Sequence, residues 1–185
     1  MSVKSIGTDR WHNFIKPDEK KSINYLQIGS LYRTNITSVL GTYAKNPLSL
    51  VHCIDHWLNY TNFREYKGKF DNLFQNFFNN LEEEDKNKLI IHCGYSHIKI
   101  PELINNFFDI IFIDGDLNSE YVLENAVLAF RKLKINGIMI INKLNETSLL
   151  QNGIRAFISC YASKIEIIGE INGEEVFLKK IKPHF

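Results

Sequence analysis

The sequence has few cysteines, almost no net charge and no long apolar run, and each shortage excludes a class of protein. Its 185 residues include 3 cysteines, and the charged side chains nearly cancel at a formal +1. Without CxxC or Cys/His spacing, the three cysteines indicate neither a disulfide framework nor a zinc site. We expect Cys53, Cys93 and Cys160 to be buried, reduced thiols at strand ends. A near-neutral chain also lacks the broad basic surface typical of nucleic-acid binding.

Signals for membranes and secretion are missing as well. No stretch approaches the ~18 apolar residues of a membrane span, and the start, MSVKSIGTDRW, lacks the apolar segment of a secretory signal. We therefore expect a cytoplasmic protein with no membrane partner and no nucleic-acid partner. Frequent Asn, Ile and Lys are typical of an AT-rich genome, as in a low-GC bacterium or a large DNA virus. A viral protein would be located in the host cytoplasm.

Apolar runs alternate with helical patterns, which favours an α/β fold. Strands are expected at Ile23–Ile28, Leu50–Ile54, Leu89–Cys93, Phe108–Ile113 and Ile138–Ile141. Helices are expected at Asn35–Tyr43, Phe70–Leu81, Ser119–Leu133 and Leu149–Tyr161, with a turn at Lys134–Gly137. Because no repeat or linker divides the chain, we expect a single domain over 1–185, in which 1–22 is a helical or irregular extension.

The last third of the sequence departs from a simple parallel series. Two β-like runs, Ile165–Glu170 and Glu175–Lys180, flank Asn172-Gly173, a dipeptide that favours a type I′ hairpin turn. A series of parallel strands that ends in an antiparallel hairpin differs from the ordinary plan of dinucleotide-dependent dehydrogenases.

Several segments together resemble the class I S-adenosylmethionine (SAM)-dependent methyltransferases, in particular the small sugar and macrolide O-methyltransferases. The segments are YLQIGS (Tyr25–Ser30), VHCIDHW (Val51–Trp57), GYSHIKIPEL (Gly94–Leu103), FFDIIFIDGDLNSEYVLENAVLAFRKLK (Phe107–Lys134) and NGIMIIN (Asn136–Asn142). The resemblance implies a Rossmann-like, doubly wound seven-stranded sheet with helices on both faces, strand order 3-2-1-4-5-7-6 and an antiparallel last strand. It also implies SAM as the cofactor.

The first strand-to-helix turn is where the cofactor's methionine end is expected. Backbone amides around Gly29 and Ser30 are suited to a carboxylate, since ligands bind at the carboxyl ends of parallel strands. The family usually has an acidic residue at Gln27 and further glycines at positions 31 or 33. Two interpretations stay open: Arg33 pairs with the cofactor carboxylate, or Tyr32 and Arg33 fill the pocket.

The next two strand ends are expected to hold the adenosine. Asp55 suits the ribose hydroxyls, and its alternative role is to cap a turn. His56 and Trp57 align with residues that line the adenosine in the family, and Gly94-Tyr95-Ser96 resemble the segment that passes the adenine. Trp57 is otherwise a core aromatic, and the segment at Tyr95 is otherwise a surface loop.

Methyl transfer is expected after the fourth strand, where Asp114 and Asp116 are the candidates for contact with the acceptor. Metal-dependent relatives have His at position 117 and an acidic pair after the fifth strand, where this chain has Leu117 and Asn142-Lys143. That departure argues against a divalent metal, and only Asp114 and Asn142 are left as weak candidates for its ligands. Lys143 either replaces the metal's charge as an orienting or basic group, or is a solvated lysine at a strand end.

The sequence therefore predicts a SAM-dependent methyltransferase that O-methylates a small molecule or a sugar. The alternative is a catalytically degenerate protein of the same fold that acts as a binding or scaffold subunit. An exposed aromatic face on Phe70–Leu81 would favour a homodimer.

Overall fold

The computed structural model describes residues 8–30, 34–57, 78, 79, 81–115, 118–142 and 148–184. Its helical elements are η1 (Thr8–Asn13, a 3₁₀ helix), α1 (Thr34–Thr42), α3 (Glu83–Lys86), α4 (Ser96–Glu102), α5 (Ser119–Lys132) and α6 (Ser148–Tyr161). Its strands are β1 (Asn24–Ile28), β2 (Leu50–Asp55), β3 (Leu89–Cys93), β4 (Phe108–Ile113), β5 (Leu133–Ile141), β6 (Ile165–Ile171) and β7 (Glu175–Lys180).

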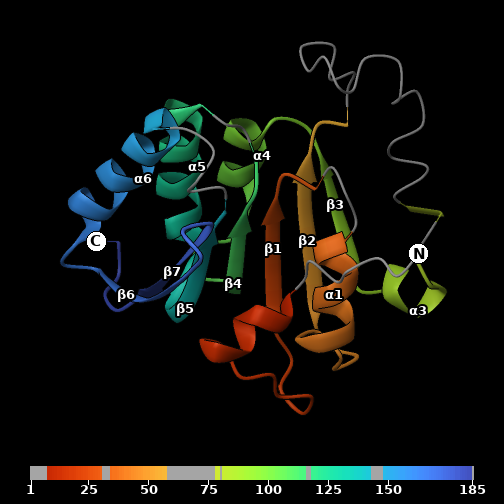
Figure 1. Ribbon diagram of the computed structural model, residues 1–185. Coiled ribbons are helices and arrows are strands. Elements are labelled where there is room, and N and C mark those ends of the chain that lie inside the picture. Colours follow the sequence, from red (N-terminus) through yellow and green to blue (C-terminus); the bar gives the residue numbers. More distant parts are fainter. Residues whose placement is uncertain are drawn as a thin grey trace.

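The strands form one seven-stranded sheet in the order β3-β2-β1-β4-β5-β7-β6, as the sequence predicts. The neighbours from β3 to β5 pair in parallel, whereas β7 pairs antiparallel with both β5 and β6 (Figure 1). The predicted α/β class, strand order and antiparallel last strand are thus confirmed.

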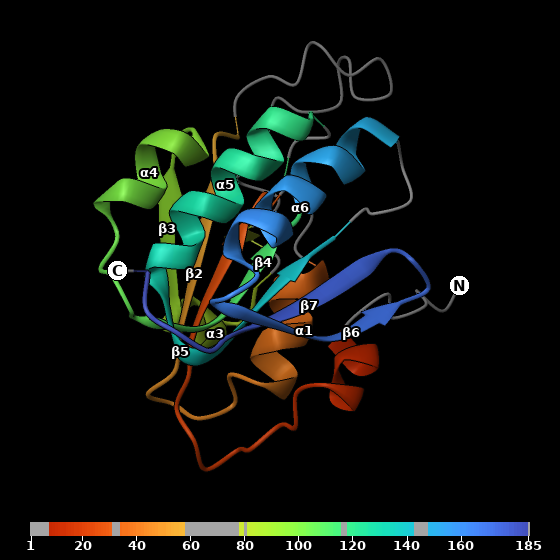
Figure 2. The ribbon, with the colours of Figure 1, turned by 90° about the vertical axis from the view of Figure 1, so that its left-hand side faces the viewer.

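Helices cover both faces of the sheet because each central strand is apolar on both sides. On one face, η1 and α1 pack against the sheet through residues such as Trp11, Val39 and Leu40. On the other face, α4, α5 and α6 contribute residues such as Ile100 and Phe130 to a second core. Figures 1 and 2 show α1 on one side of the sheet and the α4–α5–α6 layer on the other.

The terminal hairpin forms as its sequence indicates. Glu174 N–H donates to Ile171 O at 2.7 Å, closing the turn. Both central residues have positive φ, +51° at Asn172 and +67° at Gly173. This is the backbone of a type I′ turn, which matches the right-handed twist of the two strands.

Two local predictions are wrong. The segment Lys134–Gly137 is part of β5 and not a turn, since β5 begins at Leu133 and absorbs a register shift against β4, with Asn136 at φ +64°. Of the three cysteines, Cys53 is buried, but Cys93 at the end of β3 and Cys160 within α6 are exposed. A strand end is buried only when a helix covers that point, which residue type alone does not determine.

Most of the predicted helix at Phe70–Leu81 lies outside the described residues. Within it, Phe78 and Asn79 are helical and Leu81 is buried. The predicted dimer face therefore stays a prediction.

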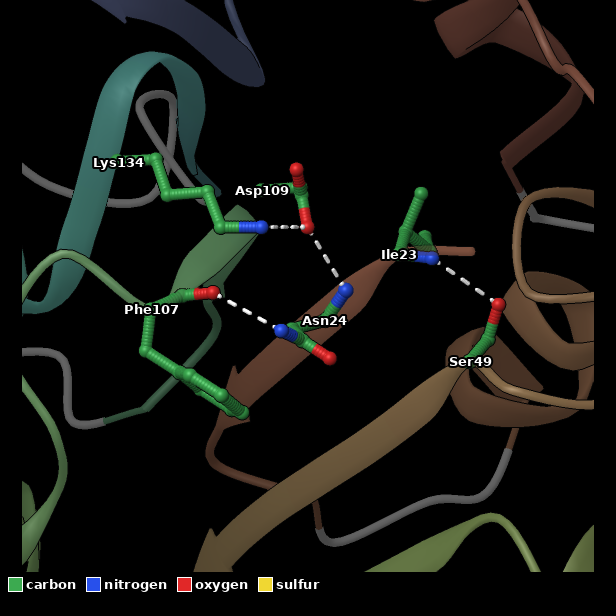
Figure 3. A network of polar contacts seen from close by, with 6 residues as sticks. All are labelled: Ile23, Asn24, Ser49, Phe107, Asp109 and Lys134. Atoms are coloured by element: carbon green, nitrogen blue, oxygen red, sulfur yellow. Dashed lines mark hydrogen bonds and ion pairs between the residues drawn. The ribbon is translucent and has the colours of Figure 1, made fainter. Parts of the chain in front are cut away.

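A polar network ties the amino ends of the strands together (Figure 3). Asp109 Oδ2 accepts from Asn24 N–H at 2.9 Å and pairs with Lys134 Nζ at 2.8 Å, while Ile23 N–H donates to Ser49 Oγ at 3.1 Å. A cavity of about 190 Å³ lies beside this network, with walls that include Tyr43. It is at the opposite edge of the sheet from the predicted cofactor site. Among the described residues, no helix is both long and apolar enough to cross a membrane.

Candidate functional site at the carboxyl edge of the sheet

Five strands present one row of residues at the carboxyl edge of the sheet. The pairings end at Ile54, Ile28, Ile113, Ile141 and Val176, which lie side by side. Extending each register by one residue gives the next row, in spatial order: Asp55, Gly29, Asp114, Asn142 and Glu175. Backbone hydrogen bonds continue the ladder, from Gly29 N–H to Ile54 O, Asp114 N–H to Ile28 O and Asn142 N–H to Ile113 O.

This row faces the α1 side of the sheet. Side chains alternate along a strand, and the row two residues earlier on that face holds buried Cys53, Phe112, Ile140 and Phe177 of the α1-side core. Apart from the buried Gln27 of β1, which lies in the same earlier row, the carboxyl edge therefore changes from an apolar core to a polar rim within one repeat of the strand. Such a rim beside the switch in strand order, between β1 and β4, is where ligands bind in open α/β sheets.

Gly29 brings the end of β1 very close to the segment after β4. It has φ +82°, and a Cβ at this position would lie 2.4 Å from the carbonyl oxygen of Asp114. Only glycine fits there. Gln27 supports the turn from below: its Nε2 donates to Gly29 O at 3.0 Å, and its Oε1 accepts from Tyr25 Oη at 3.1 Å.

Asp55 is 5% exposed and links two strand ends. Its Oδ2 accepts from Ser30 N–H at 2.7 Å, and its Oδ1 accepts from Trp57 N–H at 3.0 Å. The convergence of Gly29 and Asp55, on which the predicted site depends, is therefore present. The turn-capping role of Asp55 is present too, and both Gly29 N–H and Ser30 N–H already donate within the protein.

The end of β3 adds an aromatic wall. Gly94 has φ +146°, and its N–H donates to Asp55 O at 2.9 Å. Tyr95 follows, half exposed, with its ring 5.2 Å from that of His56 and 5.8 Å from that of His97. Ser96 is the first residue of α4. The structure thus brings the predicted adenosine residues after β2 and β3 together.

Asp114 and Asn142 form a hydrogen-bonded pair, in which Asn142 Nδ2 donates to Asp114 Oδ1 at 3.1 Å. Asn142 thus turns an N–H toward the carboxylate. Mg²⁺ prefers several hard, mostly anionic oxygens, so this donor set does not fit the ion. The residues described also contain no group of three His, Cys, Asp or Glu side chains arranged to hold a metal.

Glu175 is the functional candidate that the sequence reasoning missed. It begins β7 across from Asn142 and is 7% exposed, and its Oε2 accepts from Trp11 Nε1 at 3.1 Å. Burial raises the pKa of Glu175, and the negative charge of Asp114 raises it further, against the Trp11 hydrogen bond and Arg10, which lower it. The predicted strand order could have pointed to Glu175, because an antiparallel seventh strand beside the fifth puts its first residue, Glu175, next to Asn142.

Three predicted site residues, Arg33, Asp116 and Lys143, lie outside the described residues, as do Leu31, Tyr32 and Leu117. Their roles stay predictions.

The strand order and the rim at its carboxyl edge define the class I methyltransferase fold. No protein-family model matches the chain, and no curated protein matches it. Solved structures do match, at low identity. The Methanococcus jannaschii fibrillarin pre-rRNA processing protein is 14% identical, with a TM-score of 0.59, over 91% of this chain and 70% of its own.

Two further structures agree with it. The Podospora anserina methyltransferase PaMTH1, solved with bound S-adenosylhomocysteine (SAH), is 10% identical, with a TM-score of 0.60, over 89% of this chain and 74% of its own. An O-methyltransferase family protein from Burkholderia thailandensis is 8% identical, with a TM-score of 0.59, over 90% and 53%. At such identities the likeness establishes the fold alone.

Proposed function

We propose that the protein is a SAM-dependent methyltransferase that O-methylates a small molecule or a sugar. The observation that carries this proposal is the polar row from Asp55 through Gly29 and Asp114 to Asn142, at the carboxyl edge of a methyltransferase-type sheet. The near-neutral charge of the chain favours a small acceptor over a nucleic acid.

The cofactor would lie across the ends of β1, β2 and β3. Asp55, held in one orientation by two backbone amides, would accept hydrogen bonds from the ribose hydroxyls. His56 and Tyr95 would flank the adenine. Because Gly29 has no Cβ, the ends of β1 and β4 can lie close together beside the cofactor. Because Gly29 N–H and Ser30 N–H already donate hydrogen bonds within the protein, the methionine carboxylate would be bound by the residues that follow, Arg33 among them.

The acceptor would approach from the side of Asp114 and Asn142. Bound SAM supplies an electrophilic methyl group on a positively charged sulfur. The protein's part is to align the acceptor oxygen with that methyl group and to remove the hydroxyl proton. Asp114, fixed by Asn142, orients the acceptor, while Asp116 and Lys143 are the further candidates for this side.

Calorimetric titration of the wild type and an Asp55→Ala variant with SAH tests the proposal. We expect micromolar binding by the wild type and at least a tenfold loss in the variant, because a charge-assisted hydrogen bond contributes about 1.5–3 kcal/mol. Asp18→Ala, which changes an exposed aspartate on the far edge of the sheet, is the matched control and should bind like the wild type. Absence of heat with both SAH and SAM would overturn the proposal.

One observation favours the alternative of a binding or scaffold subunit. The two amides best placed for a cofactor carboxylate, at Gly29 and Ser30, already have partners in the protein. A degenerate protein would bind neither SAM nor SAH yet keep its folding stability, so the same titration separates the two functions.

A further inference from the structure

The β7 end of the polar row holds a carboxylate in an unusual environment. Glu175 is almost fully buried, and its Oε2 is held by the indole N–H of Trp11. Among the described residues, no hydrogen bond engages its second oxygen, Oε1. Trp11 is itself fixed, because its ring packs 5.2 Å from Phe112 and 6.4 Å from Phe177 in the α1-side core. The carboxylate therefore has a set position at the rim.

The charges that face Glu175 come from three neighbouring segments. Asp114 after β4 and Glu174 in the hairpin repel its negative charge, while Arg10 on η1 attracts it. Arg10 forms its ion pair with Glu174, at 3.1 Å, and acts on Glu175 only through the attraction of its charge. Tyr25, whose pKa is raised mainly by burial, also feels both Asp114 and Glu175. The net result raises the pKa of Glu175, which makes its ionised carboxylate a stronger proton acceptor than an ordinary glutamate.

A purely structural role does not need this charge. A neutral amide oxygen could also accept the Trp11 N–H, whereas a buried ionised carboxylate with Asp114 two strands away costs stability. Charged groups that a protein keeps despite such a cost in stability are concentrated at functional sites.

We propose that Glu175 is the catalytic base of the methyl transfer. The inference rests on the proposed function. The acceptor oxygen forms a bond to the methyl carbon, and the carbon–sulfur bond breaks with its electron pair going to sulfur, which turns the sulfonium into a neutral thioether. The hydroxyl proton passes to the Glu175 carboxylate and from there to water. Asp114 and Asn142 orient the acceptor, and Trp11 is a positioning residue for Glu175.

The indole N–H of Trp11 provides a direct reporter, since its resonance should follow the ionisation of the glutamate that accepts its hydrogen bond. The chain has 2 tryptophans, so an ¹⁵N-edited spectrum shows two indole signals, and Trp11→Phe identifies which belongs to Trp11. The experiment follows that signal from pH 4 to 8 in the protein saturated with SAM and, separately, with SAH. The two ligands differ by one methyl group and one positive charge.

If Glu175 faces the transferred methyl group, the sulfonium should lower the midpoint of the Trp11 titration by about one pH unit relative to SAH, as expected for a unit charge several ångströms away. Glu175→Gln should abolish the titration, whereas Glu174→Gln, its exposed neighbour, should keep the difference between the ligands. Equal midpoints with the two ligands, or a titration that survives Glu175→Gln, would overturn the inference while leaving the proposed function intact. A lack of saturable response to both ligands would overturn the proposed function itself, and the inference with it.

Discussion

At the scale of single residues, Gly29 is the position where geometry leaves the least choice. Its φ of +82° and the 2.4 Å between a built Cβ and Asp114 O mean that any side chain displaces the backbone. We expect Gly29→Ala to lower the free energy of unfolding by at least ~2 kcal/mol, through strain and overpacking. Urea denaturation measures this change.

Gly41 provides the matched control. It lies within α1, and a Cβ there would have no atom within 4 Å. Gly41→Ala should therefore raise stability by ~0.5–1 kcal/mol, since alanine is the better helix former. Equal effects of the two substitutions would contradict the close approach of the β1 and β4 ends.

Residue by residue, the sequence predicted Gly29, Asp55 and Asp114 as site residues because each directly follows or ends an apolar run. It did not identify Glu175, because a residue at the start of a strand attracts attention only after the register with a distant strand is known. Nor could it show that the Ser30 amide is taken by Asp55, a contact between residues 25 positions apart.

At the scale of elements, β2 and β3 are joined by a histidine pair in which His52 is buried and His92 is partly buried. His52 Nδ1 lies 3.0 Å from His92 Nε2, and the two rings stack at 5.1 Å. Two phenylalanine rings pack edge-on against His52. Burial, followed by the neighbouring His92, lowers the pKa of His52 to about 4. Burial also lowers the pKa of His92, with Lys99 acting in the same direction and Glu102 against it.

This pair makes stability depend on pH in a defined direction. Since the folded pKa of His52 is below the unfolded value of about 6.5, the unfolded chain binds more protons between these limits. The contribution of neutral His52 is complete above pH 6.5 and is lost as the pH falls toward 4, a change of about 2–3 kcal/mol.

Urea denaturation of the wild type and His52→Gln between pH 7.5 and 4.5 isolates this contribution. The wild type should lose more stability than the variant on acidification. His97→Gln, which removes an exposed histidine at the start of α4, should follow the wild type. Parallel stability curves for the wild type and His52→Gln would show that His52 is not buried as described.

The described strands, α1, α5 and α6 follow the sequence prediction within a few residues, because their apolar periodicity matches how they are buried. The start of β5 does not, since an Asn-Gly pair resembles a turn but here forms an irregularity inside a strand. Composition could not reveal that β4 would hold this segment in register.

At the scale of the whole molecule, the fold separates two edges with different roles. The amino edge is closed by neutralised pairs such as Lys134 and Asp109, whereas the carboxyl edge gathers Asp55, Asp114 and Glu175. The hairpin signal at Asn172-Gly173 and the family resemblance made this topology predictable. The chemistry of the acceptor was not, because it depends on which side chains converge across the rim.

The central claim is that a nucleoside binds across the ends of β1 and β2. A crystal structure of the protein soaked with SAH tests it most directly. We expect the ribose hydroxyls within hydrogen-bonding distance of Asp55 and the sulfur directed toward the rim formed by Asp114, Asn142 and Glu175. Ligand bound instead in the amino-edge cavity beside Tyr43, or a carboxyl edge left empty at saturating SAH, would contradict the account.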